Sequence, residues 1–296
     1  MPFLGELSAL LTALFWSGSS IVFAAAISRI GSVQVNVTRL IFGALFLLAV
    51  ILVFGFKIHL SSSQYANLAI SGFLGLVFGD TFLFQSYVYN GARLSMLIMS
   101  VAPAISAILA YFFIHEVLSF WGILGIFVTM AGIAIVVTER KEDGSTVHKI
   151  TTAGIVYGVL GAFGQGAGLV VARLAFDEAP INGIVATFVR IVPSLAILVP
   201  LGWMTKRFVN PIRVFNEDRR ALKLTIAGAI LGPCLGITFS LIAVAHTSVG
   251  IAATLMATSP IMMLPMAKTI QKETLTWKAI AGAFVAVAGV SILFLR

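Results

Sequence analysis

Apolar stretches of about 20 residues recur along the whole chain, and short polar segments separate them. A helix of this length crosses the hydrocarbon core of a bilayer. The pattern predicts ten transmembrane helices, at residues 4–27, 33–54, 65–88, 95–114, 120–137, 153–175, 182–203, 221–243, 249–267 and 277–295. The two longest predicted loops, 138–152 and 204–220, leave no room for a soluble domain.

The composition agrees with a chain that is embedded in a membrane. Of the 296 residues, 59% are hydrophobic and 10% are charged, and the mean hydropathy is +1.07; soluble domains carry about 25% charged residues. The continuous apolar runs favour helices over barrel strands, which alternate apolar and polar positions. The predicted fold class is therefore an all-α integral membrane protein. Its first span has no basic segment before it, so we expect it to be retained as a helix rather than cleaved as a signal peptide.

The formal net charge of +8 does not indicate a nucleic-acid-binding face, because almost all Lys and Arg residues lie in the predicted loops. They divide unevenly between the two sides of the predicted bundle: one side carries only Lys57, Arg173 and Arg296. Basic loops stay in the cytoplasm. The distribution predicts a multi-pass protein of the cell membrane, plasma or inner, with the basic side in the cytoplasm and both termini outside.

The two halves of the sequence resemble each other. Glu116 and Glu273 are 157 residues apart, and the same offset superposes Gly75 on Gly232, Gly79 on Gly236, Thr81 on Thr238, Met99 on Met256, Pro103 on Pro260 and Gly132 on Gly289. With shorter loops, Arg39 aligns with Arg190. The predicted organisation is a five-helix repeat at 1–138, a cytoplasmic linker at 139–152 and a second five-helix repeat at 153–296. An odd number of spans inverts the second repeat, and inverted repeats are typical of alternating-access carriers.

Two matching stretches resemble the EamA-type branch of the drug/metabolite transporter superfamily. The first runs from Ser100-Val-Ala-Pro103 through His115-Glu116-Val-Leu-Ser119 to Ala131-Gly132, and the second runs from Thr258-Ser-Pro260 through Lys272-Glu273-Thr-Leu-Thr276 to Ala288-Gly289. The family usually has glycine before that glutamate, where this chain has His115 and Lys272. The resemblance implies a ten-helix carrier with a central cavity lined by the first, third and fourth spans of each half. It implies no particular substrate.

Charged residues inside the spans are the strongest candidates for function, because a charge in hydrocarbon costs at least about 2.5 kcal/mol. Arg39 and Asp80 lie at similar depth, so we expect them to pair, either as a fixed structural bridge or as a coupling pair in which Asp80 takes up a proton. Arg190 matches Arg39, but the position matching Asp80 is Ile237. Two explanations for the Arg190 charge are open: Asp177 or Glu178 acts as its counter-ion, or the charge faces an aqueous vestibule and meets the substrate. Because Arg173 lies near the same end, such a vestibule would be positive and would favour a carboxylate or a phosphate on the solute.

Polar side chains near the middle of the spans are candidates for substrate contact: Trp16, Ser20, Gln85 and Gln165, together with Arg190. Pro103 and Pro260 interrupt their spans at equivalent positions and are candidate hinges. Glu116 and Glu273 each precede a hydroxyl residue, and we expect the carboxylate and the hydroxyl to cap the helix that follows.

The function predicted from these features is secondary transport of a small polar or amphipathic metabolite by alternating access, as an exporter or an exchanger, with protons as the candidate coupling ion. A flippase for a lipid-linked substrate is the alternative, and a membrane-embedded enzyme or a passive channel fits less well. No enzyme, metal or cofactor motif is found in the sequence. The expected partners are a small-molecule substrate and the lipid bilayer, and both a monomer and a homodimer are compatible with the sequence.

Overall fold

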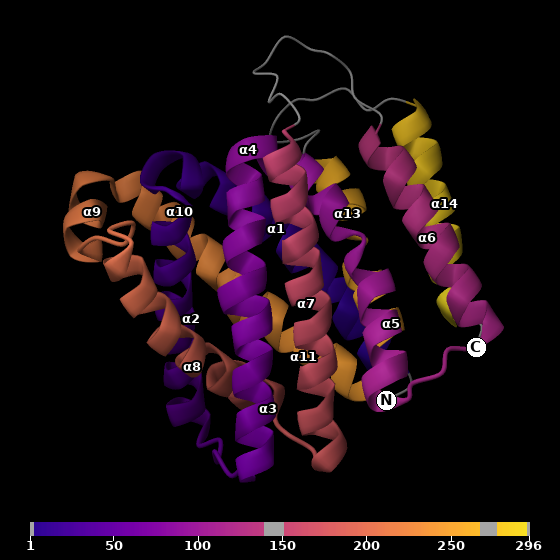
Figure 1. Ribbon diagram of the computed structural model, residues 1–296, viewed down its shortest axis with the longest axis horizontal. Helices are drawn as coiled ribbons and strands as arrows, with labels where there is room; N and C mark the ends of the chain where they lie inside the picture. The colour runs from indigo at the N-terminus through magenta and orange to yellow at the C-terminus, as the bar shows by residue number, and fades with distance from the viewer. Residues whose placement is uncertain (1–2, 139–150, 267–276, 295–296) are drawn as a thin grey trace.

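The computed structural model describes residues 3–138, 151–266 and 277–294, and every regular element within them is a helix. Long helices run roughly parallel to one another in a single bundle, and α1 begins and α14 ends toward the same end of it (Figure 1). In chain order the elements are α1 (Leu4–Ile30), α2 (Ser32–Phe54), α3 (Ser62–Gly72), η1 (Phe73–Gly79), α4 (Asp80–Met99), α5 (Ala102–Ile114), α6 (Phe120–Thr138), α7 (Thr152–Glu178), α8 (Gly183–Met204), α9 (Pro211–Glu217), α10 (Arg219–Ala229), η2 (Ile230–Gly236), α11 (Ile237–His246), α12 (Val249–Met256), α13 (Ser259–Met266) and α14 (Trp277–Phe294).

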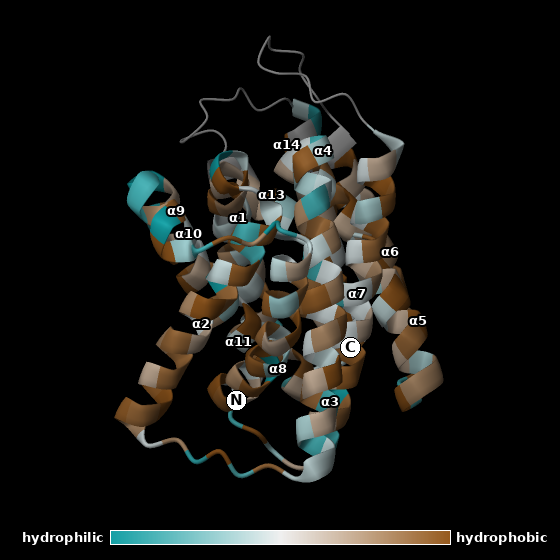
Figure 2. Ribbon diagram, turned by 60° about the vertical axis from the view of Figure 1, so that its left-hand side comes forward, coloured by the Kyte–Doolittle hydropathy of each residue, from teal (hydrophilic) through white to brown (hydrophobic). Residues whose placement is uncertain are grey.

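The helices have the length and composition of membrane spans. Among the described residues, seven helical segments are long and apolar enough to cross a membrane, and three shorter apolar helices lie where the fifth, ninth and tenth spans were predicted, at Phe120–Ile135, Val249–Met263 and Ile280–Leu293. Large hydrophobic side chains are exposed on α2, α5 and α6, and the ribbons of these helices are coloured mostly as hydrophobic, whereas α9 carries polar residues as well (Figure 2). The chain is therefore a multi-pass membrane protein with an apolar exterior.

The helices also contain breaks that hydrophobicity does not reveal. Between α3 and α4, and again between α10 and α11, the helix widens into a seven-residue π-helix, η1 and η2. Both π-helices contain glycines at the equivalent third and seventh positions, and in each the backbone N–H of the following residue, Asp80 or Ile237, donates to a carbonyl five residues earlier. Such π-helical turns are frequent at functional sites.

Two further features differ from the predicted spans. Gly91 has a left-handed backbone (φ 72°, ψ 166°) that divides the third span from the fourth inside α4; glycine adopts this conformation without strain. The segment 204–220, predicted as a loop, contains the short helix α9. Its first residue is Pro211, and the Asn210 side chain caps it by accepting from the backbone N–H of Ile212. The prediction of a plain loop was wrong because α9 is too short to produce a hydrophobic pattern.

The first residues of the helices recur along the chain at a constant spacing. α3 and α10 begin 157 residues apart, and the same spacing separates the first residues of η1 and η2, α4 and α11, α5 and α13, and α6 and α14. The last pair packs together through small residues: a methyl group at Gly132 would overlap Ala286, and one at Gly289 would overlap Thr129. Thr129 and Ala286 are themselves 157 residues apart, so the two contacts are reciprocal.

Candidate functional site

A cavity lies in the middle of the bundle, and its wall comes from both matching segments of the chain. The first segment contributes α1, α2, η1 and α4, and the second contributes α7, α8, η2 and α11. The cavity has a volume of about 60 Å³. The charged residues in its wall are Arg39, Asp80 and Arg190, and uncharged polar groups are supplied by Trp16, Ser19, Tyr87, Gln165 and Ser240. The cavity therefore contains all three ionisable side chains that the sequence placed deep inside spans.

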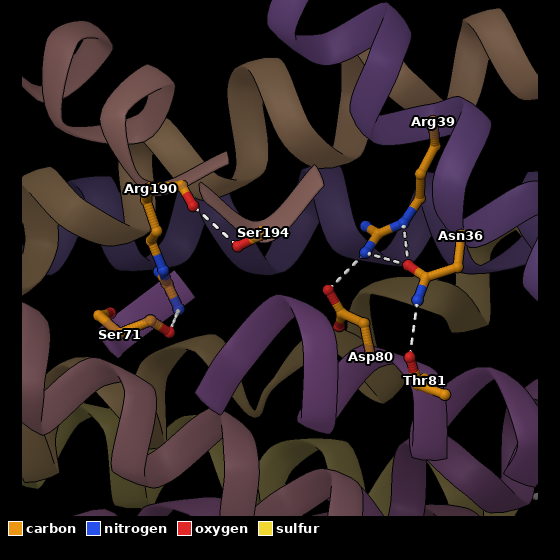
Figure 3. Close-up of polar contacts among 7 residues, drawn as sticks. All are labelled: Asn36, Arg39, Ser71, Asp80, Thr81, Arg190 and Ser194. Carbon is orange, nitrogen blue, oxygen red and sulfur yellow. Dashed lines mark hydrogen bonds and ion pairs between the residues drawn. The ribbon is translucent and has the colours of Figure 1, made fainter. Parts of the chain in front are cut away.

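Arg39 and Asp80 form the expected ion pair, with 2.5 Å between Nη2 of Arg39 and Oδ2 of Asp80 (Figure 3). Asn36 Oδ1 accepts from Nε and Nη2 of Arg39, at 3.1 and 2.9 Å. The guanidinium carbon also lies 4.8 Å from the centre of the Phe84 ring, a cation–π contact. Because α4 begins at Asp80, directly after η1, the π-helix sets the direction in which this carboxylate points. Arg39 is thus held by a carboxylate, an amide and an aromatic ring of its own half of the protein.

Arg190, the counterpart of Arg39, is bound very differently. It is 1% exposed, and the one hydrogen bond of its side chain to the described part of the chain runs from Nη2 to the carbonyl of Ser71, at 3.4 Å (Figure 3). The guanidinium lies in a groove formed by glycines, since a methyl group at Gly75 would overlap it and one at Gly168 would lie 3.1 Å from Nη2. Nε of Arg190 is buried without a partner among the described residues.

The structure shows no counter-ion for Arg190 at Asp177 or Glu178 and places Arg173 apart from it, whereas the expectation that the Arg190 charge meets an anionic substrate stays a prediction. Asp177 pairs with Arg173 instead, with 2.6 Å between Oδ1 and Nε, and no hydrogen bond or ion pair joins Glu178 to Arg190 within the described residues. Arg173 does not share a vestibule with Arg190, because its Nη1 donates to the carbonyls of Val244 and Thr247. The error has a simple cause: Arg190 sits on the central face of α8 and extends into the cavity, away from the loop that follows α7.

The four uncharged candidates for substrate contact separate into two groups. Trp16 and Gln165 line the cavity, and no hydrogen bond from either side chain to the described part of the chain is present. Ser20 and Gln85 lie outside the lining: Ser20 donates to the carbonyl of Ser17 at 2.9 Å, and Gln85 Oε1 accepts from Ser32 at 2.8 Å. Both are therefore occupied by structural hydrogen bonds.

The two candidate hinge prolines lie just after breaks in their spans. Pro103 is in the first turn of α5, where a missing N–H carries no penalty, and the turn at Ser100 and Val101 separates α5 from α4. Pro260 occupies the second position of α13, after the turn at Ala257 and Thr258. The breaks are thus equivalent in position, and the prolines begin a new helix rather than bend an existing one.

Glu116 does cap a helix, but it is a different helix from the one predicted. Its carboxylate accepts from the backbone N–H groups of Val249, at 3.0 Å, and Gly250, at 3.4 Å, at the start of α12. Ser119 caps α6 as predicted, accepting from the N–H of Gly122 at 3.1 Å. The sequence could not reveal that the α5–α6 turn lies against a helix 130 residues later. Glu273 lies outside the described residues.

Sequence reasoning missed several residues that shape the site. Asn36 is not among the candidates from the sequence, yet it is 2% exposed and connects Arg39 to Thr81, to which its Nδ2 donates at 3.0 Å. Tyr87, which is not among them either, lines the cavity. One signal was present: Asn36 and Arg39 are three residues apart and so share a helix face.

Comparisons with known proteins give the family and the fold. The EamA-like transporter family matches the chain twice, over residues 3–138 and 152–295. A solved structure titled "Crystal structure of protein" aligns with 98% of this chain and 96% of its own, with a TM-score of 0.77 and 14% sequence identity; at this identity the likeness concerns the fold. No curated protein sequence matches the chain. The family matches, which cover nearly the whole chain, show that this protein belongs to the EamA-like transporter family of membrane transporters.

Proposed function

We propose that the protein is a secondary carrier that moves a small polar or amphipathic organic solute across the cell membrane by alternating access. The observation that carries the proposal is the central cavity, which is enclosed by helices of both matching segments and contains three ionisable side chains. Carriers of this type bind their substrates near the membrane midplane, between two structural repeats. Trp16, Gln165 and Arg190 are the proposed substrate contacts.

The proposal includes ten spans arranged as two inverted repeats, residues 1–138 and 153–296, joined by a linker. The constant 157-residue spacing of the helix bounds supports a repeat. The reciprocal contacts of Gly132 with Ala286 and of Gly289 with Thr129 are those expected across a twofold axis. Five spans in each repeat place the second one upside down, so movement of one repeat against the other exposes the cavity to each side in turn. The helix breaks before Pro103 and Pro260 are suited to act as hinges.

A counterflow assay in proteoliposomes tests the carrier. A panel of small metabolites is first screened by the rise in thermal unfolding temperature that a bound ligand produces. For any ligand found in this way, unlabelled solute inside the vesicles is expected to accelerate uptake of labelled solute, because the carrier returns loaded. Linear, non-saturating flux without counterflow would indicate a channel and would reject the proposal. If Asp80 carries the coupling proton, Asp80→Asn retains counterflow but loses accumulation driven by a pH gradient.

The proposed orientation places α9 in the cytoplasm and the start of α3 outside. Single cysteines at two exposed positions, Ser62→Cys and Asn216→Cys in a Cys234→Ser background, test it directly. A membrane-impermeant maleimide is expected to label intact cells at position 62 and not at position 216. Labelling at position 216 alone would reverse the orientation.

A further inference from the structure

Arg190 has hydrogen-bonding capacity that the protein leaves unused. A guanidinium carries five N–H donors, and Arg190 makes one long hydrogen bond to the described residues, while its Nε has none. The side chain is 1% exposed and lines the cavity. Buried donors are almost always satisfied, and a buried charge without a partner is costly. The cavity therefore presents a charged group in need of a partner.

In the first half, the crossing of α2 and α4 places Asp80 against Arg39. The equivalent crossing in the second half is that of α8 and α11. Thr238 on α11 donates to Thr187 on α8 at 3.1 Å, and the equivalent residues of the first half, Thr81 on α4 and Asn36 on α2, are joined by a hydrogen bond of 3.0 Å in which Asn36 is the donor. Each arginine comes three residues after one member of its pair, Asn36 or Thr187, and the position equivalent to Asp80 directly precedes the other member, Thr81 or Thr238. Position 237 is thus the equivalent of position 80 in this crossing and lines the same cavity as Arg190, but residue 237 is isoleucine. Arg190 lacks a counter-ion because Ile237 replaces the aspartate where α11 crosses α8.

This asymmetry leaves the cavity with one uncompensated positive charge. Asp80 is bonded to Arg39, and it reaches Arg190 only as a through-space attraction. The Gln165 amide and the Trp16 indole line the same cavity as Arg190 and make no hydrogen bonds to the described part of the chain. Leu83, Met96 and Met99 supply apolar wall. The lining thus combines a single excess positive charge and free donors with an apolar surface.

On the basis of the proposed carrier function, we propose that Arg190 binds the carboxylate of an amphipathic organic monoanion, with Gln165 and Trp16 donating to the same ligand and the apolar walls receiving its tail. An arginine pairs with a carboxylate through two parallel hydrogen bonds. One negative charge on the ligand neutralises the cavity, whereas a dianion would exceed the positive charge available. The substrate is thus selected by charge at one end and by hydrophobicity at the other.

Matched carboxylates and amides test the proposal. The purified full-length protein is titrated with acetate, butyrate, hexanoate, benzoate and 3-phenylpropionate, and with the amide of each, and Kd is obtained from the rise in unfolding temperature. The longer carboxylates are expected to bind at least about 10-fold more tightly than their amides, the contribution of a charge-assisted hydrogen bond. Arg190→Gln is expected to remove this preference.

Because Arg190→Gln deletes a large buried side chain and can unfold the protein, Ile237→Asp provides a second test. It supplies the missing acid, so the carboxylate preference is expected to fall about 10-fold, while Ile237→Asn, similar in shape but uncharged, is expected to retain it. No carboxylate preference in the natural protein, or an unchanged preference in a folded Ile237→Asp variant, would overturn the proposal. Counterflow of neutral solutes would then still support a carrier. Conversely, a carboxylate preference without any counterflow would retain the anion site and reject the carrier.

Discussion

Replacing Asp80 with asparagine is expected to destabilise the protein by about 3 kcal/mol, the effect of removing one partner from a buried ion pair. The change preserves the shape of the side chain and removes the negative charge opposite Arg39. That guanidinium, of which 5% is exposed, would keep the Asn36 oxygen as an acceptor but would lose its counter-ion. The measurement is the free energy of unfolding of the purified protein in detergent.

A double-mutant cycle identifies the pair as the cause. Arg39→Gln is expected to destabilise by a similar amount, and the double variant is expected to fall short of the sum by about 1 to 3 kcal/mol, because neither charge is then left alone. Asp177→Asn is the matched control: it removes a carboxylate from an exposed pair with Arg173, where the expected loss is under about 1 kcal/mol. Additive effects of Asp80→Asn and Arg39→Gln would show that the two residues act independently.

The sequence predicted the Arg39–Asp80 pair because depth in a membrane span follows from counting residues, at 1.5 Å of rise for each. Two charges at equal depth in hydrocarbon have few alternatives to each other. The same reasoning failed for Arg190. Depth placed it near Asp177 and Glu178, but the direction of its side chain depends on how α8 is rotated against η1 and α7. That rotation is fixed by Gly72, Gly75 and Gly168, whose missing side chains make room for the guanidinium.

The helix breaks show a second limit of prediction from the sequence. Hydrophobicity identified the spans, since solvation by lipid depends on composition over about 20 residues. It carries no information on the local hydrogen-bond register, so η1 and η2 appeared only as apolar helix. The paired glycines at 75 and 79, repeated at 232 and 236, are visible as repeated residues, but the repeat alone does not indicate a π-helix. Ser20 and Gln85 illustrate the same limit, because a polar residue in a span is drawn as readily to a neighbouring carbonyl or hydroxyl as to a cavity.

The crossing of α7 over η1 gives the second large expected effect: Gly164→Ala should destabilise the protein by about 2 to 3 kcal/mol. A methyl group at residue 164 would lie 2.6 Å from the carbonyl oxygen of Leu74 and 2.7 Å from Cα of Gly79. Both atoms belong to backbone, so no rotation of a side chain relieves the overlap, and α7 has to move away from η1. Gln165 follows Gly164 in α7, and Asp80 follows Gly79 at the end of η1. Both residues line the cavity and would move with these two helices, so ligand affinity is expected to fall as well.

Two other glycines separate this effect from the general consequence of adding a methyl group. At Gly122 in α6 the nearest atom would be 3.5 Å away, so Gly122→Ala is expected to leave stability unchanged or to raise it by up to about 1 kcal/mol through helix propensity. Gly236 is the equivalent of Gly79, and a methyl group there would lie 2.6 Å from the Trp16 indole. Because an indole can turn aside, Gly236→Ala is expected to lose less stability than Gly164→Ala while still displacing Trp16 in the cavity. If Gly164→Ala unfolds at the same temperature as Gly122→Ala, then the backbone contact between α7 and η1 does not hold the two halves at their present distance.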